Sequence, residues 1–120
     1  MVHNMRLNSA PFEAMKAGKK TVEIRLNDEK RKGVKKGDVI IFTRTDGAEQ
    51  LTVEVVGLYP FGTFRELYEK FTPEVCGSAH KGIGERLADT YKNYYSKEQE
   101  KRCGVLGIEI KLAGQEKGGL

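Results

Sequence analysis

The chain has 120 residues, of which 38% are apolar and 32% are charged, and this composition is typical of one folded domain with a core of its own. It excludes an intrinsically disordered chain, and no apolar run approaches the length of a membrane span. The net charge is +4, the first residues lack the apolar segment of a signal peptide, and the two cysteines, Cys76 and Cys103, are too few for a disulfide framework. We therefore expect a cytoplasmic protein with free thiols and no membrane partner.

The first quarter of the chain predicts a strand, a short helix and a second strand. Residues 3–7 alternate weakly between polar and apolar side chains and indicate an opening strand. A helix is expected to start at Pro11 and to end at Gly18, with Phe12 and Met15 on one face. The second strand is predicted from Lys20 to Leu26.

This second strand carries the most varied chemistry in the chain. Its apolar residues alternate with Thr21, Glu23 and Arg25, so one face can enter a core while the other presents an acid, a base and a hydroxyl. Strict alternation places Lys20 on the apolar face, and it reaches the polar face only if the strand begins after it or bulges. The alternative is an ordinary surface ladder of ion pairs.

A basic loop follows over residues 27–37 and accounts for the positive charge. Without its five basic residues, 16 basic residues stand against 17 acidic ones in the rest of the chain; the five are Lys30, Arg31, Lys32, Lys35 and Lys36. A local basic patch suits an anionic partner such as RNA, DNA or a nucleotide. Acidic residues flank the loop, and a merely solvated surface is the alternative reading.

Two strands joined by a tight turn come next. Residues 39–42 form an apolar strand after a Lys-Gly-Asp turn, and Asp46-Gly47 is a hairpin turn that leads to a strand over residues 51–56. Four strands before residue 60, mostly close in sequence, predict a mainly antiparallel sheet.

Helices are predicted for most of the second half. Capping boxes at 63–66 and 96–99 each open a helix, and apolar residues at helical spacing indicate another helix from Ile83 onward. The intervening residues 72–84 are rich in glycine and are expected to form a loop. A last strand is predicted over residues 105–110, and residues 114–120 are expected to be a flexible tail after a domain of residues 1–113.

Strands at both ends of the chain, with helices between them, indicate the α+β class. We expect a small sheet that curls into a barrel with its terminal strands paired and its openings covered by helices.

Several segments together resemble the ASCH domain family, over residues 3–112. The most specific is the Gly-x-Lys-x-x-Glu-x-Arg pattern, which Gly18, Lys20, Glu23 and Arg25 fill. The opening His-x-Met-x-Leu, the Lys-Gly-Asp turn and the Gly-Val-Leu-Gly-Ile strand contribute to the resemblance. It implies a small, mainly antiparallel PUA-like β-barrel with helices covering its openings. It also implies a cleft beside the barrel that is suited to RNA or a nucleotide.

The resemblance and the residues together predict a ligand-binding site centred on the second strand. Arg25 would clamp a phosphate or a base edge, Lys20 would supply a point charge, and Glu23 would accept a hydrogen bond from an exocyclic amine. Further candidates are Thr21 on the same strand, Arg6 and Ser9 beside the first helix, and Tyr95. Of Tyr94 and Tyr95, we expect one to pack in the core and the other to be exposed for stacking on a base.

Two other functions stay open at this point. Some ASCH-like proteins are amidohydrolases that act on acetylated cytidine, and others are reported as ribonucleases. Lys20 matches the lysine of the amidohydrolases, but Glu23 occupies the position of their threonine nucleophile, and Glu74 lies near their downstream acid. The enzymatic alternative is therefore a hydrolase of RNA or of a modified nucleoside, with Lys20 and Glu23 as the acid/base pair.

The third possibility is a regulatory module that binds a protein or a small metabolite. No cofactor is expected. No metal is expected either, because Cys76-x-x-x-His80 with Cys103 and His3 does not match the spacing of a zinc site.

Overall fold

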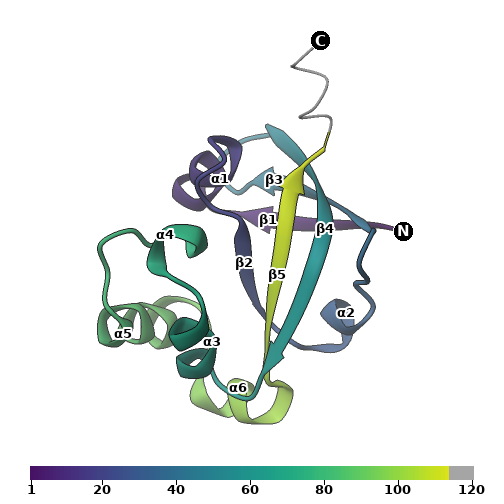
Figure 1. The fold of residues 1–120 in the computed structure, drawn as a ribbon. Coiled ribbons are helices and arrows are strands. Elements are labelled where there is room, and N and C mark those ends of the chain that lie inside the picture. The colour runs from purple at the N-terminus through teal and green to yellow at the C-terminus, as the bar shows by residue number, and fades with distance from the viewer. Residues whose placement is uncertain (114–120) are drawn as a thin grey trace.

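The computed structural model describes residues 1–113, and the predicted tail of residues 114–120 lies outside the described residues. In the described part of the chain no helix is long and apolar enough to cross a membrane. The elements follow one another in the order β1 (Val2–Leu7), α1 (Ser9–Lys16), β2 (Val22–Leu26), α2 (Glu29–Lys32), β3 (Val39–Arg44), β4 (Gln50–Phe61), α3 (Phe64–Lys70), α4 (Pro73–Cys76), α5 (Ile83–Asn93), α6 (Lys97–Cys103) and β5 (Val105–Leu112) (Figure 1).

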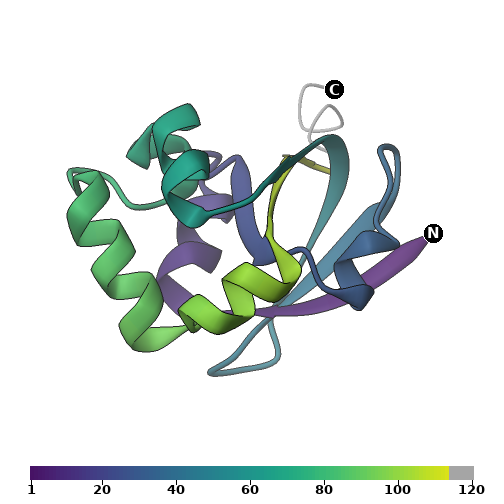
Figure 2. The ribbon, with the colours of Figure 1, turned by 90° about the horizontal axis from the view of Figure 1, so that it is seen from below.

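The five strands form one curled sheet in the order β1-β3-β4-β5-β2 (Figure 1). The pair β1–β3 is parallel, and the other three pairs are antiparallel. Helices α3 to α6 gather on one side of this sheet, whereas α2 lies on the other side (Figure 2). The predicted α+β class with a mainly antiparallel, PUA-like sheet is therefore confirmed.

The expected pairing of the terminal strands is wrong. Strand β5 lies between β4 and β2, so both of its edges are occupied, and β1 pairs instead with β3, where Met5 stands opposite Phe42. A parallel pair needs a long crossover connection, which residues 8–38 supply. The sheet is consequently open between its two edge strands, β1 and β2.

Two separate hydrophobic clusters hold the structure together. The first fills the inside of the curled sheet beneath α1, and its fully buried members include Phe12, Met15, Ile40, Phe42 and Val53. The second joins β2 and the start of β5 to the helical side, and its members include Val22, Phe64, Leu67, Leu87 and Val105. The inside of the sheet thus has its own core, whereas the helical layer shares a second core with β2 and the start of β5.

Several element boundaries differ from the predictions. Helix α1 begins at Ser9 rather than Pro11, because proline is tolerated anywhere in the first helical turn, where backbone amides have no helical partner. Strand β2 begins at Val22 rather than Lys20. Both predicted loops contain a short helix: Asp28 caps α2 by accepting from the Arg31 amide at 3.1 Å, and Pro73 occupies the first turn of α4. The two predicted capping boxes are confirmed.

Asp38, in the turn before β3, ties that turn to β1. Its carboxylate lies 2.8 Å from His3 Nε2 and accepts from the Lys35 amide at 3.0 Å. The hydrogen bond with His3 and the one from the Lys35 amide lower the pKa of the Asp38 carboxyl from 3.8 to about 2. The ionised carboxylate therefore favours the folded chain.

We expect this link to fail in acid. A lowered folded-state pKa contributes stability that is present above about pH 4 and is lost as the pH falls through about 2. Urea unfolding midpoints measured across this interval should therefore fall less steeply for Asp38→Asn than for the parent protein. Parallel curves for the two proteins would contradict the contact with His3.

Candidate functional site

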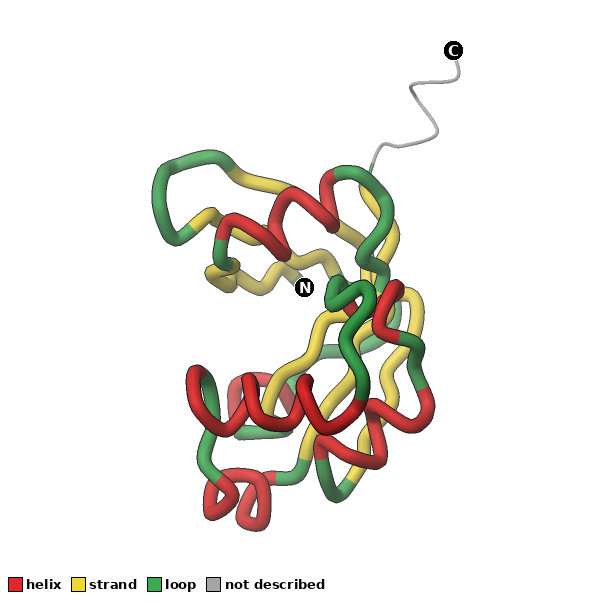
Figure 3. The backbone as a smooth tube through the Cα atoms, turned by 90° about the vertical axis from the view of Figure 1, so that its left-hand side faces the viewer, coloured by secondary structure: helices red, strands yellow, loops and turns green. Residues whose placement is uncertain are grey.

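A cleft of about 620 Å³ lies between the curled sheet and the helical layer. Its sheet wall comes from the end of β1, the start of α1 and β2, and its helical wall comes from α3, the α4–α5 segment and α5. In the backbone trace of Figure 3, α1 lies above α5. The volume falls within the range of about 300–1,000 Å³ that is usual for small-molecule sites.

Three charged side chains from one short segment meet on the sheet side of the cleft. Glu23 Oε1 lies 3.1 Å from Lys20 Nζ, and Glu23 Oε2 accepts from Arg25 Nε at 2.6 Å. The side chains of Lys20 and Glu23 are only 3% and 6% exposed, so this is a buried ion triad rather than a surface ladder. The three residues that the sequence predicted at one site thus lie together and line this cavity, and that they bind a ligand stays a prediction.

Lys20 reaches the triad because β2 begins after it, which is one of the two conditions set by strand alternation. Its ammonium also donates to the carbonyl oxygens of Val22, at 2.7 Å, and Cys76, at 2.9 Å. With Glu23 these acceptors match the three hydrogens of the ammonium group. Lys20 is thus a positioning cation that joins β2 to α4 across 56 residues of sequence.

Arg25 spans the open side of the sheet. Its Nη2 donates to the Arg6 carbonyl oxygen at 2.6 Å, and its guanidinium lies over the Phe42 ring at 5.9 Å from the centroid. It therefore links edge strands β1 and β2, which have no backbone pairing with each other.

The charge state of Glu23 follows from its partners. Burial alone would raise the pKa of the Glu23 carboxyl, but the charges of Lys20 and Arg25 and their hydrogen bonds outweigh burial and lower it. Glu23 is consequently an ionised hydrogen-bond acceptor at neutral pH.

The other predicted site residues divide into two groups. Arg6 and Tyr95 line the cleft, whereas Ser9 and Thr21 are not among its lining residues. The backbone of Thr21 serves the fold instead, because its amide donates to Val75 O at 2.8 Å and its carbonyl accepts from the Ile110 amide at 2.9 Å. Glu74 is exposed and is not a lining residue either.

The basic patch lies away from the cleft, and none of its residues lines the cavity. Arg31 is held by Asp28 at 3.1 Å, while the other four side chains are exposed: Lys30, Lys32, Lys35 and Lys36. Among residues 1–113, no group of three or more His, Cys, Asp or Glu is arranged to hold a metal ion.

One of the two tyrosines is packed and the other is exposed, as expected, but the predicted ligand residue, Tyr95, is the packed one. Tyr95 is half-buried and stacks on Phe64, with ring centroids 5.6 Å apart and an interplanar angle of 11°. Tyr94 is 59% exposed, and both side chains line the cleft. Tyr94 is therefore the ring that a ligand can reach most freely.

Arg86 on α5 is a cleft residue that the sequence analysis missed. It is only 4% exposed, donates from Nη2 to Tyr68 O at 3.1 Å, and lies over the Tyr68 ring at 4.5 Å. A signal was present, because Arg86 lies three residues after Ile83 and four before Thr90, on the packed face of the helix.

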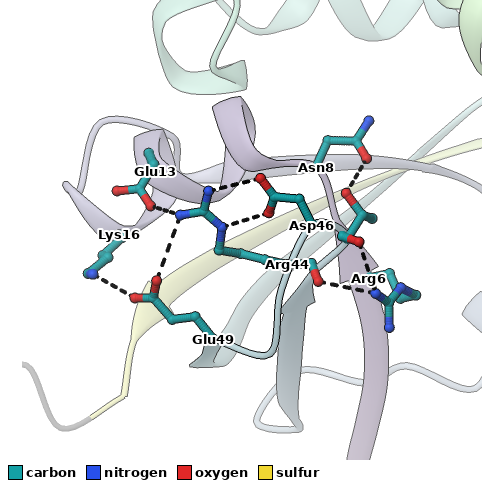
Figure 4. A network of polar contacts seen from close by, with 8 residues as sticks. Arg6, Asn8, Glu13, Lys16, Arg44, Asp46 and Glu49 are labelled. Atoms are coloured by element: carbon teal, nitrogen blue, oxygen red, sulfur yellow. Dashed lines mark hydrogen bonds and ion pairs between the residues drawn. The ribbon is translucent and has the colours of Figure 1, made fainter.

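The rim of the cleft is supported by an exposed polar network around Arg44 (Figure 4). The Arg44 side chain contacts Glu13, Asp46 and Glu49, which joins α1 to the hairpin between β3 and β4. The same hairpin accepts from Arg6 Nη2 through the carbonyls of Arg44, at 3.2 Å, and Thr45, at 3.4 Å. Exposed ion pairs stabilise little individually, and Arg6 is held by the backbone carbonyls of the hairpin rather than by these ion pairs.

Gly77, which ends α4, packs against Lys20. Its φ is +81°, and a Cβ built on it would lie 2.9 Å from Lys20 Cδ. We expect Gly77→Ala to lose more stability in urea denaturation than Gly18→Ala, which has the same φ but open space around it. Backbone strain costs about 1–2 kcal/mol in either variant, and only Gly77→Ala also displaces Lys20. Equal losses would show that the Lys20 stem does not pack here.

The fold and the cleft define a small α+β protein with a curled, mainly antiparallel sheet and a charged cleft between sheet and helices. Residues 5–113 match the sequence model described as the ASCH domain, and the chain therefore belongs to the ASCH domain family. No curated protein sequence matches the chain.

Solved structures agree with this assignment. The chain is similar to hypothetical protein PH0355, with 40% identity over 93% of this chain and 99% of that one and a TM-score of 0.83. It is also similar to protein PF0455 from Pyrococcus furiosus, with 34% identity over 94% and 98% of the two chains and a TM-score of 0.68. An ASCH domain from Lactobacillus crispatus JV V101 is 14% identical over 92% and 79%, with a TM-score of 0.64, and shares the fold.

Proposed function

We propose that this protein binds a nucleotide or a short segment of single-stranded RNA in the cleft beside β2. The observation that carries this proposal is a concave site of ligand size with an excess of positive charge. Five cationic side chains line it against two carboxylates: Arg6, Lys20, Arg25, Lys81 and Arg86 against Glu23 and Asp89. Such an excess favours an anionic ligand.

The polar groups of the cleft suit recognition of a base. Glu23 is held ionised, and its oxygens have further acceptor capacity for the exocyclic amine of a base. Arg25 presents guanidinium donors beside it, and the exposed ring of Tyr94 offers a stacking surface. Membership of the ASCH domain family supports a nucleic-acid type of ligand.

Hydrolysis of RNA or of a modified nucleoside is the second candidate. It is favoured by the burial of Lys20 and Glu23 in one cavity, 3.1 Å apart. A general base works best with a pKa near neutrality, however, whereas the pKa of Glu23 is lowered and the Lys20 hydrogens are already engaged. The contacts therefore favour binding over catalysis.

The test is a titration of the protein with mononucleotides and short RNAs, with turnover followed in the same samples. Arg6→Ala and Tyr94→Ala change exposed cleft residues, and each should weaken binding, the tyrosine change by about 1–3 kcal/mol for a stacked base. The control is Arg102→Ala on α6, which is exposed and outside the cleft. Turnover abolished by Glu23→Gln in folded protein would instead favour the hydrolase. If the protein shows neither binding nor turnover, a module that binds a protein or a small metabolite would be favoured.

The basic patch on and after α2 is proposed as a second RNA contact, supported by its four exposed lysines. Changing Lys30, Lys32, Lys35 and Lys36 to alanine should weaken the salt dependence of RNA binding, because each lost phosphate contact reduces the slope of log K against log[salt] by about 0.7 for a single strand. Mononucleotide affinity should stay unchanged, since the patch lies outside the cleft. If the slope of log K against log[salt] for RNA binding is unchanged, the four lysines contact solvent and not RNA.

A further inference from the structure

Within the described residues 1–113, the guanidinium of Arg86 is a buried cation without a carboxylate partner. Among residues 1–113 no acidic side chain forms an ion pair with it, although it is 4% exposed. Its Nε is also a buried donor without a hydrogen-bond acceptor in this part of the chain. Burial of an unpaired charge costs free energy, so we expect another interaction to compensate the charge of Arg86.

A structural role accounts for part of the arrangement. Nη2 and Nη1 donate to the carbonyl oxygens of Tyr68, at 3.1 Å, and Phe71, at 3.4 Å, so Arg86 caps the C-terminal end of α3. The Tyr68 ring adds a cation–π contact. The carbonyl oxygens and the ring carry only partial charges. They do not neutralise the net charge of Arg86, and they provide no acceptor for its Nε.

The neighbouring groups do not supply the missing anion. Asp89 lies on the same wall, but its carboxylate is 2.7 Å from Lys81 Nζ, and Glu23 is shared by Lys20 and Arg25. Burial raises the pKa of the Cys76 thiol, which keeps it neutral despite the nearby charges of Lys20 and Arg86. Arg86 nevertheless lines the cleft, together with Lys81 and Ser78.

We propose that Arg86 forms an anion subsite that takes the phosphate group of a nucleotide in the cleft, an inference that rests on the proposed function. A phosphate supplies the negative charge that the buried guanidinium lacks, and its oxygens can accept from the guanidinium hydrogens that the carbonyls of Tyr68 and Phe71 leave free. Lys81 and the Ser78 hydroxyl, on the same wall, supply the further donors that its oxygens need. The site is thus specific for nucleotides over nucleosides.

The first experiment titrates the unaltered protein with inorganic phosphate and follows the arginine Nε–H signals by nitrogen-edited NMR. The Arg86 signal should shift in a saturable way, whereas the signal of exposed Arg102 should not. This measurement needs no substitution in the buried site. An unmoved Arg86 signal, or equal shifts of Arg86 and Arg102, overturns the subsite.

The second experiment compares a nucleoside with its 5′-monophosphate by calorimetry. Arg86→Lys and Lys81→Ala should weaken monophosphate binding, by about 10- to 100-fold for Arg86→Lys, because charge-assisted hydrogen bonds to the phosphate are lost or distorted. Nucleoside affinity should change less than about twofold, and Arg102→Ala should change neither. Lys81 is exposed, so Lys81→Ala keeps the test valid if Arg86→Lys fails to fold.

The outcomes separate the two proposals. A nucleoside and its monophosphate that bind equally overturn the subsite while the proposed function stands. Inorganic phosphate that shifts Arg86, in a protein that binds neither nucleosides nor nucleotides, would leave an anion site at Arg86 but overturn both its assignment to a nucleotide phosphate and the proposed function.

Discussion

Replacing Lys20 with methionine should lower the free energy of unfolding by about 3–5 kcal/mol, the usual effect of removing one partner from a buried ion pair. The change leaves the buried Glu23 carboxylate with Arg25 alone and removes the donor to the carbonyls of Val22 and Cys76. Urea denaturation of the parent protein and the variant measures the difference. The loss should be large because the position is 3% exposed.

Lys19 provides a matched control one residue away. It is exposed, and Lys19→Met should change the unfolding free energy by no more than about 0.5 kcal/mol. In a double-mutant cycle, Lys20→Met with Glu23→Gln should cost less than the sum of the single changes, because the contact between Lys20 and Glu23 is lost in either single variant and can be lost only once. Similar losses for Lys19→Met and Lys20→Met would contradict a buried triad.

Replacing Phe64 with alanine should cost about 3–5 kcal/mol, because it opens a cavity in the second hydrophobic cluster. Phe64 is 0% exposed, and its ring stacks on Tyr95 and meets Tyr91 edge to face. It also lines the cleft, so nucleotide affinity should fall together with stability. Thermal and urea unfolding measure the first effect, and calorimetry at a temperature where the variant is folded measures the second.

Tyr94→Ala separates these two effects. Tyr94 lines the same cleft but is 59% exposed, so its removal should weaken ligand binding while changing stability by about 0.5 kcal/mol or less. If Phe64→Ala were as mild as Tyr94→Ala, the helical wall would not depend on this aromatic cluster.

Local patterns in the sequence predicted much of the fold. The Asp46-Gly47 turn and the two capping boxes each depend on residues close together in the chain, and the structure confirms them. The strand at β2 is confirmed too, but its burial does not alternate strictly, because Glu23 is buried and Ile24 is only partly buried. The grouping of Lys20, Glu23 and Arg25 was predictable because these residues are close together in the chain. That these residues bind a ligand stays a prediction.

The features that were missed depend on contacts between distant segments. Strand β1 pairs in parallel with β3 because both edges of β5 are already occupied by β4 and β2. This pairing depends on the arrangement of the whole sheet, so no local pattern predicts it. The Cys76 carbonyl that accepts from Lys20 lies 56 residues away, and the burial of Arg86 depends on how α5 packs against α3. Short helices such as α2 and α4 are set by a single cap or proline and have no apolar period to reveal them.

The separation of the two hydrophobic clusters has a consequence for how ligand preference can diverge among relatives. One wall of the cleft belongs to the sheet, most of whose core residues lie in the first cluster, whereas the opposite wall belongs to helices that pack in the second cluster with β2 and the start of β5. Substitutions at exposed positions of this wall, such as Lys81 and Tyr94, can therefore alter which molecule is accepted without disturbing strand pairing. Natural or laboratory selection for a new ligand is therefore expected to act through substitutions on the helical wall.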